Sequence, residues 1–191
     1  MDNHNNILIV SGLPRSGTSL MMQMLEVGGI SILSDGIRQA DANNAKGYYE
    51  LEAVKNLETD YAWLYDAHGK AVKVISHLLR KLPPSFEYRI ILMQRPLDII
   101  VRSQNKMLKN LNKESGNLSD QQLVQLYELH LEQTIAWMEQ QDNVRSLKIQ
   151  YEDLLTDTDE QIKKIDSFLD LDLNKYAMRE IVDKTLNHTK E

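Results

Sequence analysis

The sequence has no cysteine among its 191 residues. That absence excludes disulfides, thiol nucleophiles and thiolate-bound zinc. A long apolar run is missing as well, because the polar residues 1–6 are followed by only four apolar residues, 7–10. Four residues are too few for a signal peptide or a membrane span. We therefore expect a cytoplasmic protein with no membrane span.

Positive charge is scarce, with 22 lysines and arginines against 28 aspartates and glutamates and a net charge of −6. A chain of this charge has no dominant basic face, which argues against a nucleic-acid or anionic-membrane binder. Repeats, low-complexity tracts and linkers are also absent. The length suits one compact domain, so we expect residues 1–191 to form a single domain.

Residues 7–20 contain the most informative pattern, which reads ILIVSGLPRSGTSL. An apolar strand passes through a glycine-rich turn into a helical pattern, and backbone N–H groups in such a turn converge on an anion. The spacing from Gly12 to Gly17, followed by Thr18 and Ser19, fits a phosphate-binding P-loop. The loop differs from an ATP-binding one because Thr18 stands in the lysine position. Its cation is Arg15.

Strands and helices are expected to alternate along the rest of the chain. This alternation predicts a three-layer α/β fold of the P-loop NTPase type, with a central, mostly parallel sheet of about four or five strands flanked by helices. The expected strands are 7–10, 71–75, 89–93 and 144–149, and the expected helices are 19–26, 50–65, 96–111, 120–141 and 151 to nearly the end.

Ligands of open parallel sheets bind beyond the carboxyl ends of the strands. Arg95 follows the third expected strand, and Ser103 lies about two turns along the helix that starts at Pro96. Arg95 and Ser103 therefore predict a second anion site beside the P-loop. The alternative is a surface arginine and an incidental helix serine. Glu152 and Asp153, after the fourth strand, are read as a helix start rather than a metal site.

Four segments together resemble the sulfotransferase family. Residues 13–19 resemble its Pro-Lys/Arg-Ser-Gly-Thr-Thr loop, and residues 95–103 resemble its second motif, in which an arginine precedes a serine by eight residues. Residues 151–155 are similar to its Tyr-Glu-Asp-Leu region, and residues 43–50 to the Asn-Pro-Lys-Gly-Tyr-Tyr/Trp-Glu segment of bacterial members. These segments occur in the family's order, so the chain is identified as a member.

The resemblance implies that the co-substrate is 3′-phosphoadenosine 5′-phosphosulfate (PAPS). A hydroxyl or amine of the acceptor would attack sulfur, and adenosine 3′,5′-bisphosphate (PAP) would leave. Arg95 and Ser103 would hold the 3′-phosphate. No metal is expected, since a sulfuryl group carries less charge than a phosphoryl group and the third strand ends without an acidic residue. The 5′-phosphosulfate end would be held by Pro14, Arg15, Ser16, Gly17, Thr18 and Ser19.

Four residues are candidates for catalysis. Arg15 would stabilise charge on the leaving group, although a plain phosphate ligand is an equal interpretation. Glu50 is the first candidate for the general base, by resemblance, and the alternative is a helix N-terminal glutamate. His77 is the second, although it lacks the lysine and proline that flank the family's histidine; the alternative is a helix cap. Lys73 either reaches the sulfuryl group or extends to solvent from a strand near an edge of the sheet.

Two other functions remain open at this point. A P-loop small-molecule kinase is opposed by Thr18 in the lysine position and by the missing metal ligand. A PAP-binding module without catalysis stays open because the chain is short and no single general base stands out. The Arg-x-x-Lys-Gly-x-x-Gly segment of eukaryotic members is also absent, which leaves part of the 3′-phosphate and adenine contact unassigned. The acceptor, whether a small molecule, a carbohydrate or a peptide, is not encoded by any motif, and neither is the oligomeric state. The candidates to contact the acceptor are Asp35, Arg38 and the aromatic residues between 48 and 65.

Overall fold

The computed structural model describes residues 6–36, 49–111 and 118–182. These residues form a five-stranded sheet in the order β2-β3-β1-β4-β5, in which every neighbouring pair is parallel. The predicted α/β fold with a parallel sheet of four or five strands is confirmed. The strands are β1 (Asn6–Gly12), β2 (Ser31–Ile32), β3 (Lys70–Lys73), β4 (Glu87–Gln94) and β5 (Val144–Gln150).

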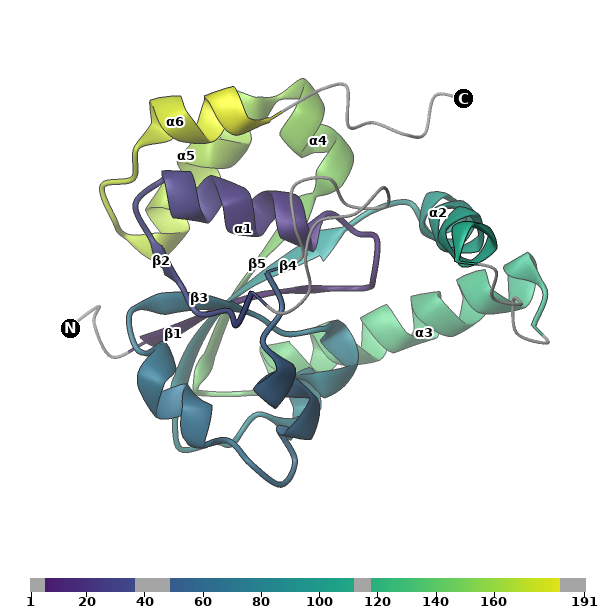
Figure 1. Cartoon of the computed structure of the whole chain (residues 1–191), viewed down its shortest axis with the longest axis horizontal. Coiled ribbons are helices and arrows are strands. Elements are labelled where there is room, and N and C mark those ends of the chain that lie inside the picture. The colour runs from purple at the N-terminus through teal and green to yellow at the C-terminus, as the bar shows by residue number, and fades with distance from the viewer. Residues whose placement is uncertain (1–5, 37–48, 112–117, 183–191) are drawn as a thin grey trace.

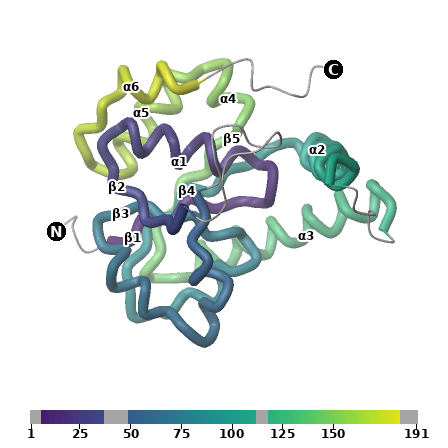
Figure 2. The backbone as a smooth tube through the Cα atoms, viewed as in Figure 1, coloured from purple at the N-terminus to yellow at the C-terminus, as the bar shows by residue number. Residues whose placement is uncertain are grey.

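Helices cover both faces of the sheet, as Figure 1 shows. One face carries α1, α4, α5 and α6, and the other carries α3 with three 3₁₀ helices. The trace in Figure 2 shows α2 beyond the ends of the strands, beside α3. The α-helices are α1 (Thr18–Val27), α2 (Leu97–Asn110), α3 (Asp120–Glu139), α4 (Tyr151–Thr156), α5 (Thr158–Leu169) and α6 (Lys175–Ile181), and the 3₁₀ helices are Glu52–Asn56, Ala62–Ala67 and Ser76–Lys81.

The central strand β1 is apolar from Ile7 to Val10 because both of its faces are buried. Successive side chains of a strand point to opposite faces. Leu8 and Val10 pack into the core beneath α1, and Ile7 and Ile9 pack into the core on the other face. A parallel strand covered on both sides therefore needs a continuous apolar run, and this run made β1 recognisable in the sequence.

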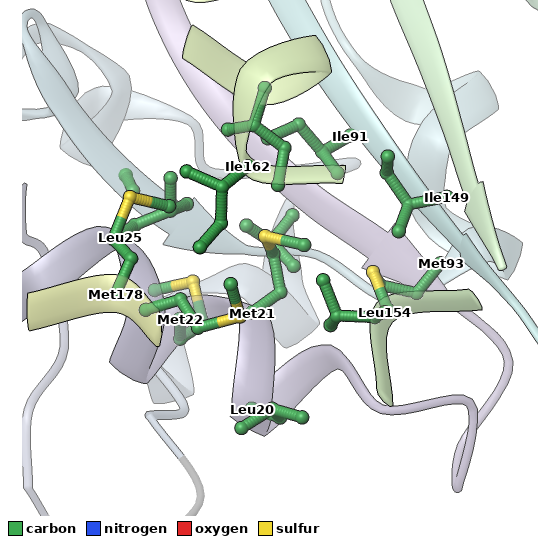
Figure 3. Packing of buried hydrophobic residues seen from close by; sticks show 14 of the residues in the cluster. Leu20, Met21, Met22, Leu25, Ile91, Met93, Ile149, Leu154, Ile162 and Met178 are labelled. Carbon is green, nitrogen blue, oxygen red and sulfur yellow. The ribbon is translucent and has the colours of Figure 1, made fainter. Parts of the chain in front are cut away.

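Methionines fill much of the core between α1 and the sheet. Figure 3 shows Met21 and Met22 of α1 close to residues of β4, α4 and α6. Met93 and Met178 are fully buried in the same cluster. Unbranched methionine side chains adapt to irregular gaps, which suits a core formed by four helices and a sheet. This core fixes α1, and with it the loop that precedes α1.

The expected helix over residues 50–65 is wrong. The structure has two 3₁₀ helices, Glu52–Asn56 and Ala62–Ala67, with a turn between them. Short polar side chains explain the break, because the Thr59 hydroxyl donates to the Asn56 carbonyl and the Asp60 carboxylate accepts from the Ala62 N–H. Such local bonds compete with helical hydrogen bonding.

The end of the chain also differs from the single helix expected after residue 151. Three helices replace it, separated at Asp157 and at residues 170–174. Asp170 has φ of 53°, a left-handed conformation that ends α5. The two-residue strand β2 is an addition that no sequence pattern predicted. Pro96 is the N-cap of α2 rather than its first residue.

Candidate functional site

The P-loop joins β1 to α1, as its sequence predicted. The Ser16 N–H donates to the Leu13 carbonyl at 3.1 Å, which closes a tight turn, and Arg15 within this turn has φ of 74°. Gly17 is the N-cap of α1, and no side chain caps the helix. The first N–H groups of a helix lack intrahelical acceptors and favour an anion at this end. The loop can therefore bind a phosphate or sulfate group through its backbone.

Two glycines of the loop are required by close contacts. A Cβ on Gly12 would lie 2.4 Å from the Ser16 hydroxyl oxygen and 2.6 Å from the Met93 carbonyl oxygen. A Cβ on Gly17 would lie 2.3 Å from the Tyr151 ring, and Gly17 has φ of 97°. The loop therefore rests on β4 on one side and on the Tyr151 ring on the other.

Arg15 connects the loop to the two residues predicted to form the second anion site. Its Nε donates to the Ser103 hydroxyl on α2 at 2.9 Å, and its carbonyl accepts from Arg95 Nη1 at 3.4 Å. Arg95 and Ser103 thus each bond to Arg15. The two predicted anion sites form one continuous cluster. The loop is also tied to α2 where the Gln104 amide donates to the Pro14 carbonyl at 3.4 Å.

Arg95 is a buried cation, which excludes the surface-arginine interpretation. Its side chain is 9% exposed, its Nε donates to Glu152 Oε1 at 3.0 Å, and its guanidinium carbon lies 4.3 Å from the centroid of the Tyr151 ring. Three polar atoms here are buried without a hydrogen-bond partner in the described part of the chain: Arg95 Nη2, Glu152 Oε2 and Ser16 Oγ. Buried polar groups are nearly always satisfied, so this cluster has unused capacity for a ligand.

Lys73 lies at the end of β3 and faces the start of α1. Its Nζ donates to the Ser19 hydroxyl at 3.4 Å and lies 3.7 Å from Glu50 Oε1. The lysine side chain is 10% exposed, and β3 lies between β2 and β1. The strand is next to the edge strand β2, but the interpretation in which Lys73 extends to solvent is wrong. Glu50 precedes the N-cap residue Leu51, so it lies outside the first turn of the following 3₁₀ helix.

His77 stacks on a second histidine. The rings of His77 and His130 lie 3.9 Å apart, centroid to centroid, at an angle of 9°. His130 Nε2 and the Ser76 hydroxyl are 2.9 Å apart. Burial, and after it the nearby His77 and Arg80, together lower the pKa of His130 to about 4. The capping interpretation is wrong, because the N-cap is Ile75 and no side chain caps this helix.

Sequence reasoning missed the partners of Arg95 and of His77. Glu152 was read as a helix start, which it also is, since α4 begins at Tyr151. Tyr151 was noted only within the segment similar to the Tyr-Glu-Asp-Leu region. A signal existed, because Arg95 and Glu152 have opposite charge and each closely follows a strand of the sheet. That signal becomes useful only once β4 and β5 are known to be neighbours. His130 had no such signal, because it lies in the middle of α3.

Some residues predicted to contact the acceptor make other contacts or lie outside the described residues. The Asp35 carboxylate accepts from the Glu52 N–H at 2.5 Å. Trp63 is buried in the core, whereas Tyr61 and Tyr65 are exposed. Arg38 and the segment 43–48 are not among the described residues.

Residues 6–36, 49–111 and 118–182 contain neither a metal-ligand cluster nor a helix that could span a membrane. No group of three or more histidine, aspartate or glutamate side chains there is arranged to hold a metal ion. None of the helices described is both long enough and apolar enough to cross a membrane.

A family profile described as the sulfotransferase domain matches residues 5–191. Among solved structures, mouse sulfotransferase SULT7A1 complexed with PAP is 23% identical, with a TM-score of 0.57, and the match covers 94% of this chain and 63% of that one. The chain thus spans less than two thirds of the length of that relative.

Two further structures are similar in fold. The sulfotransferase domain of the Synechococcus PCC 7002 olefin synthase is 15% identical, with a TM-score of 0.56, and the match covers 96% of this chain and 79% of that one. The sulfotransferase domain of the curacin biosynthetic pathway is 17% identical, with a TM-score of 0.53, and the match covers 87% and 74%. A comparison with curated protein sequences finds no match.

Proposed function

The chain belongs to the sulfotransferase domain family, and we propose that it transfers a sulfuryl group from PAPS to a hydroxyl or amine of an acceptor, without a metal ion. The observation that carries this proposal is the cluster formed by the P-loop, Arg15, Ser103 and Arg95. It offers anion-binding groups on both sides of Arg15, and PAPS carries anionic groups at both its 5′ and its 3′ positions. The mouse relative is a complex with PAP, which fits this assignment.

The loop and the start of α1 suit the 5′-phosphosulfate end of PAPS. Backbone N–H groups of the loop, the unpartnered Ser16 hydroxyl and the Ser19 hydroxyl surround the position where a helix N-terminus favours an anion. Arg95 and Ser103 suit the 3′-phosphate. A planar guanidinium can donate two parallel hydrogen bonds to a phosphate, which makes arginine well matched to this role.

Lys73, Glu50 and Arg15 supply the groups that the transfer step needs. The acceptor oxygen attacks sulfur, the bond from sulfur to the 5′-phosphate oxygen breaks, and PAP leaves with an additional negative charge. Arg15 and Lys73 stabilise that charge electrostatically. Glu50 takes the acceptor proton, and its carboxylate lies within 3.7 Å of Lys73, which in turn contacts Ser19. His77 is the second candidate for the base.

Calorimetric titration tests the binding half of this proposal. We expect PAP to bind without Mg²⁺, because the proposed reaction needs no metal site. We expect Mg·ATP to give no heat of binding, because Thr18 stands where an ATP-binding loop has its lysine. Arg95→Ala should weaken PAP binding by about tenfold or more, because a charged hydrogen-bond donor to phosphate is lost. Binding of Mg·ATP in place of PAP would instead support a kinase.

Turnover separates an enzyme from a binding module. Radiolabelled PAPS should transfer its label to a member of an acceptor panel of alcohols, phenols, amines, sugars and peptides. Glu50→Gln should abolish that turnover while PAP binding persists. Glu52→Gln is a matched control, because the exposed Glu52 forms an ion pair with the exposed Lys55. Full activity in Glu50→Gln together with loss in His77→Ala would move the base to His77. PAP binding without transfer to any acceptor would favour the module.

A further inference from the structure

Glu152 is the one anionic partner of the buried Arg95 side chain in the described part of the chain, and the proposed mechanism gives it no role. A guanidinium has five N–H donors. Arg95 uses Nε for Glu152 Oε1 at 3.0 Å and Nη1 for the Arg15 carbonyl at 3.4 Å, and Nη2 is buried with no acceptor. The ion pair with Glu152 therefore leaves the N–H groups of Arg95 Nη2 available to a ligand.

We propose that Glu152 is a positioning residue for Arg95 and that it thereby sets the preference of the site for nucleotides with a 3′-phosphate. This inference rests on the proposed function, since it takes the nucleotide to be PAP or PAPS. Glu152 acts through Arg95 and does not itself contact the nucleotide. The contribution of Glu152 is to fix one orientation of the guanidinium.

Three contacts hold the guanidinium from three directions. Glu152 accepts from Nε, the Arg15 carbonyl accepts from Nη1, and the guanidinium carbon lies over the Tyr151 ring, 4.3 Å from its centroid. Nη2 is the nitrogen without a partner. A buried donor without an acceptor is costly, and a phosphate oxygen beside Nη2 removes that cost. The fixed guanidinium is therefore preorganised for an anion at Nη2.

The sheet explains why Glu152 can hold Arg95 in place. Gln94 and Gln150 are paired at the ends of the adjacent parallel strands β4 and β5, so the residues that follow leave the sheet side by side. Tyr151 also packs against Gly17 of the loop, because a Cβ on Gly17 would lie 2.3 Å from its ring. A chain of contacts thus runs from the loop through Tyr151 and Arg95 to Glu152.

Two ligands that differ only in the 3′-phosphate isolate this effect. PAP carries phosphates at the 3′ and 5′ positions, and 5′-AMP carries only the 5′-phosphate. We expect Glu152→Ala to weaken PAP binding by about tenfold or more and to change 5′-AMP binding by less than about twofold. Glu152→Gln keeps an oxygen that can accept from Arg95 Nε, so PAP affinity should return to within about threefold of the parent.

Asp153→Asn is the matched control, because Asp153 is an exposed carboxylate in the same first turn of α4. It should bind both ligands as the parent does. Thermal melting identifies variants that do not fold. If Glu152→Ala is one of them, Glu152→Asp replaces it, because its shorter carboxylate cannot reach Arg95 Nε in the same geometry. Glu152→Asp should show the same selective loss of PAP affinity.

Three results would overturn the inference. Equal weakening of PAP and 5′-AMP would make Glu152 merely structural. Unchanged PAP binding in Glu152→Ala would show that Arg95 needs no positioning, and tighter binding would make Glu152 a competitor of the phosphate. Failure of the parent chain to bind PAP is a different result, because it removes the proposed function itself before any variant is compared.

Discussion

Gly17 links local backbone geometry to the candidate site. It has a left-handed φ of 97°, and any Cβ there would collide with the Tyr151 ring. Gly17→Ala should therefore displace either the loop or Tyr151, on which Arg95 rests. We expect PAP binding to fall by about tenfold or more and the melting temperature to drop, as a positive φ and a close ring contact are both violated. Calorimetry and thermal melting measure the two effects.

Gly29 offers a control for the backbone part of this effect. It has a similar φ of 104°, but nothing lies within 4 Å of the position that its Cβ would take. Gly29→Ala should lower stability by about 1 kcal/mol and leave PAP binding unchanged. Equal behaviour of the two variants in both measurements would show that the contact with Tyr151 is unimportant.

His130 makes stability depend on pH. Its pKa is lowered to about 4 in the folded chain by burial first and then by His77 and Arg80, whereas an unfolded histidine has a pKa of about 6.5. Between these values the unfolded chain binds a proton that the folded chain does not. The contribution of neutral His130 is therefore complete above about pH 6.5 and is lost as the pH falls toward about 4.

A variant without the imidazole tests this dependence. We expect the melting temperature of the parent to fall between about pH 7.5 and about pH 5, and we expect a smaller fall in His130→Gln, which cannot take up a proton but can still bond to Ser76. Thermal melting in a series of buffers at constant ionic strength measures both. The same fall in the two proteins would contradict the assignment to His130.

At the scale of elements, α3 depends on its N-cap. Ser119 Oγ accepts from the Gln122 N–H at 3.3 Å, and Gln122 Oε1 accepts from the Ser119 N–H at 2.9 Å, which forms a capping box. Among its 20 residues only Thr134 and Met138 are buried. Figure 1 shows its N-terminal half extending beyond the sheet, beside α2. Tertiary packing therefore contributes little at this end.

Ser119→Ala should increase fraying of the first turn of α3, because the N-cap side chain is lost. The expected cost is about 1 kcal/mol, since an N-cap hydroxyl and its reciprocal bond are lost. Hydrogen exchange should show lower protection in the first turns of α3 and unchanged protection in β1. Ser146→Ala on the exposed side of β5 is the control and should change neither. Unaltered exchange in α3 would mean that its packing against α2 outweighs the cap.

The elements differ in how well their sequence patterns predicted them. The strands β1 and β4 were predicted to within a few residues because burial on both faces requires continuous apolar runs. The segment 50–65 was predicted wrongly because local bonds from Thr59 and Asp60 break the helix, and the apolar spacing does not reveal them. The strand β2 has two residues, which is too short for any periodicity.

At the scale of the whole molecule, the order of the strands assembles the site. The arrangement β2-β3-β1-β4-β5 brings the carboxyl ends of β3, β1, β4 and β5 to the same edge of the sheet. Lys73, the P-loop, Arg95 and Glu152 each lie at or just after one of these ends. Cores on both faces hold the strands in this order, so the site depends on the packing of both cores.

The sequence by itself determined the P-loop, its cation and the alternation of strands and helices. Those features depend on residues close together in the chain, so their spacing is enough to predict them. Only the tertiary structure decided that Arg15 bonds to Ser103, 88 residues away, and that Arg95 pairs with Glu152, 57 residues away. Such contacts depend on which strands are neighbours, and that order is set by the packing of helices on both faces rather than by local spacing.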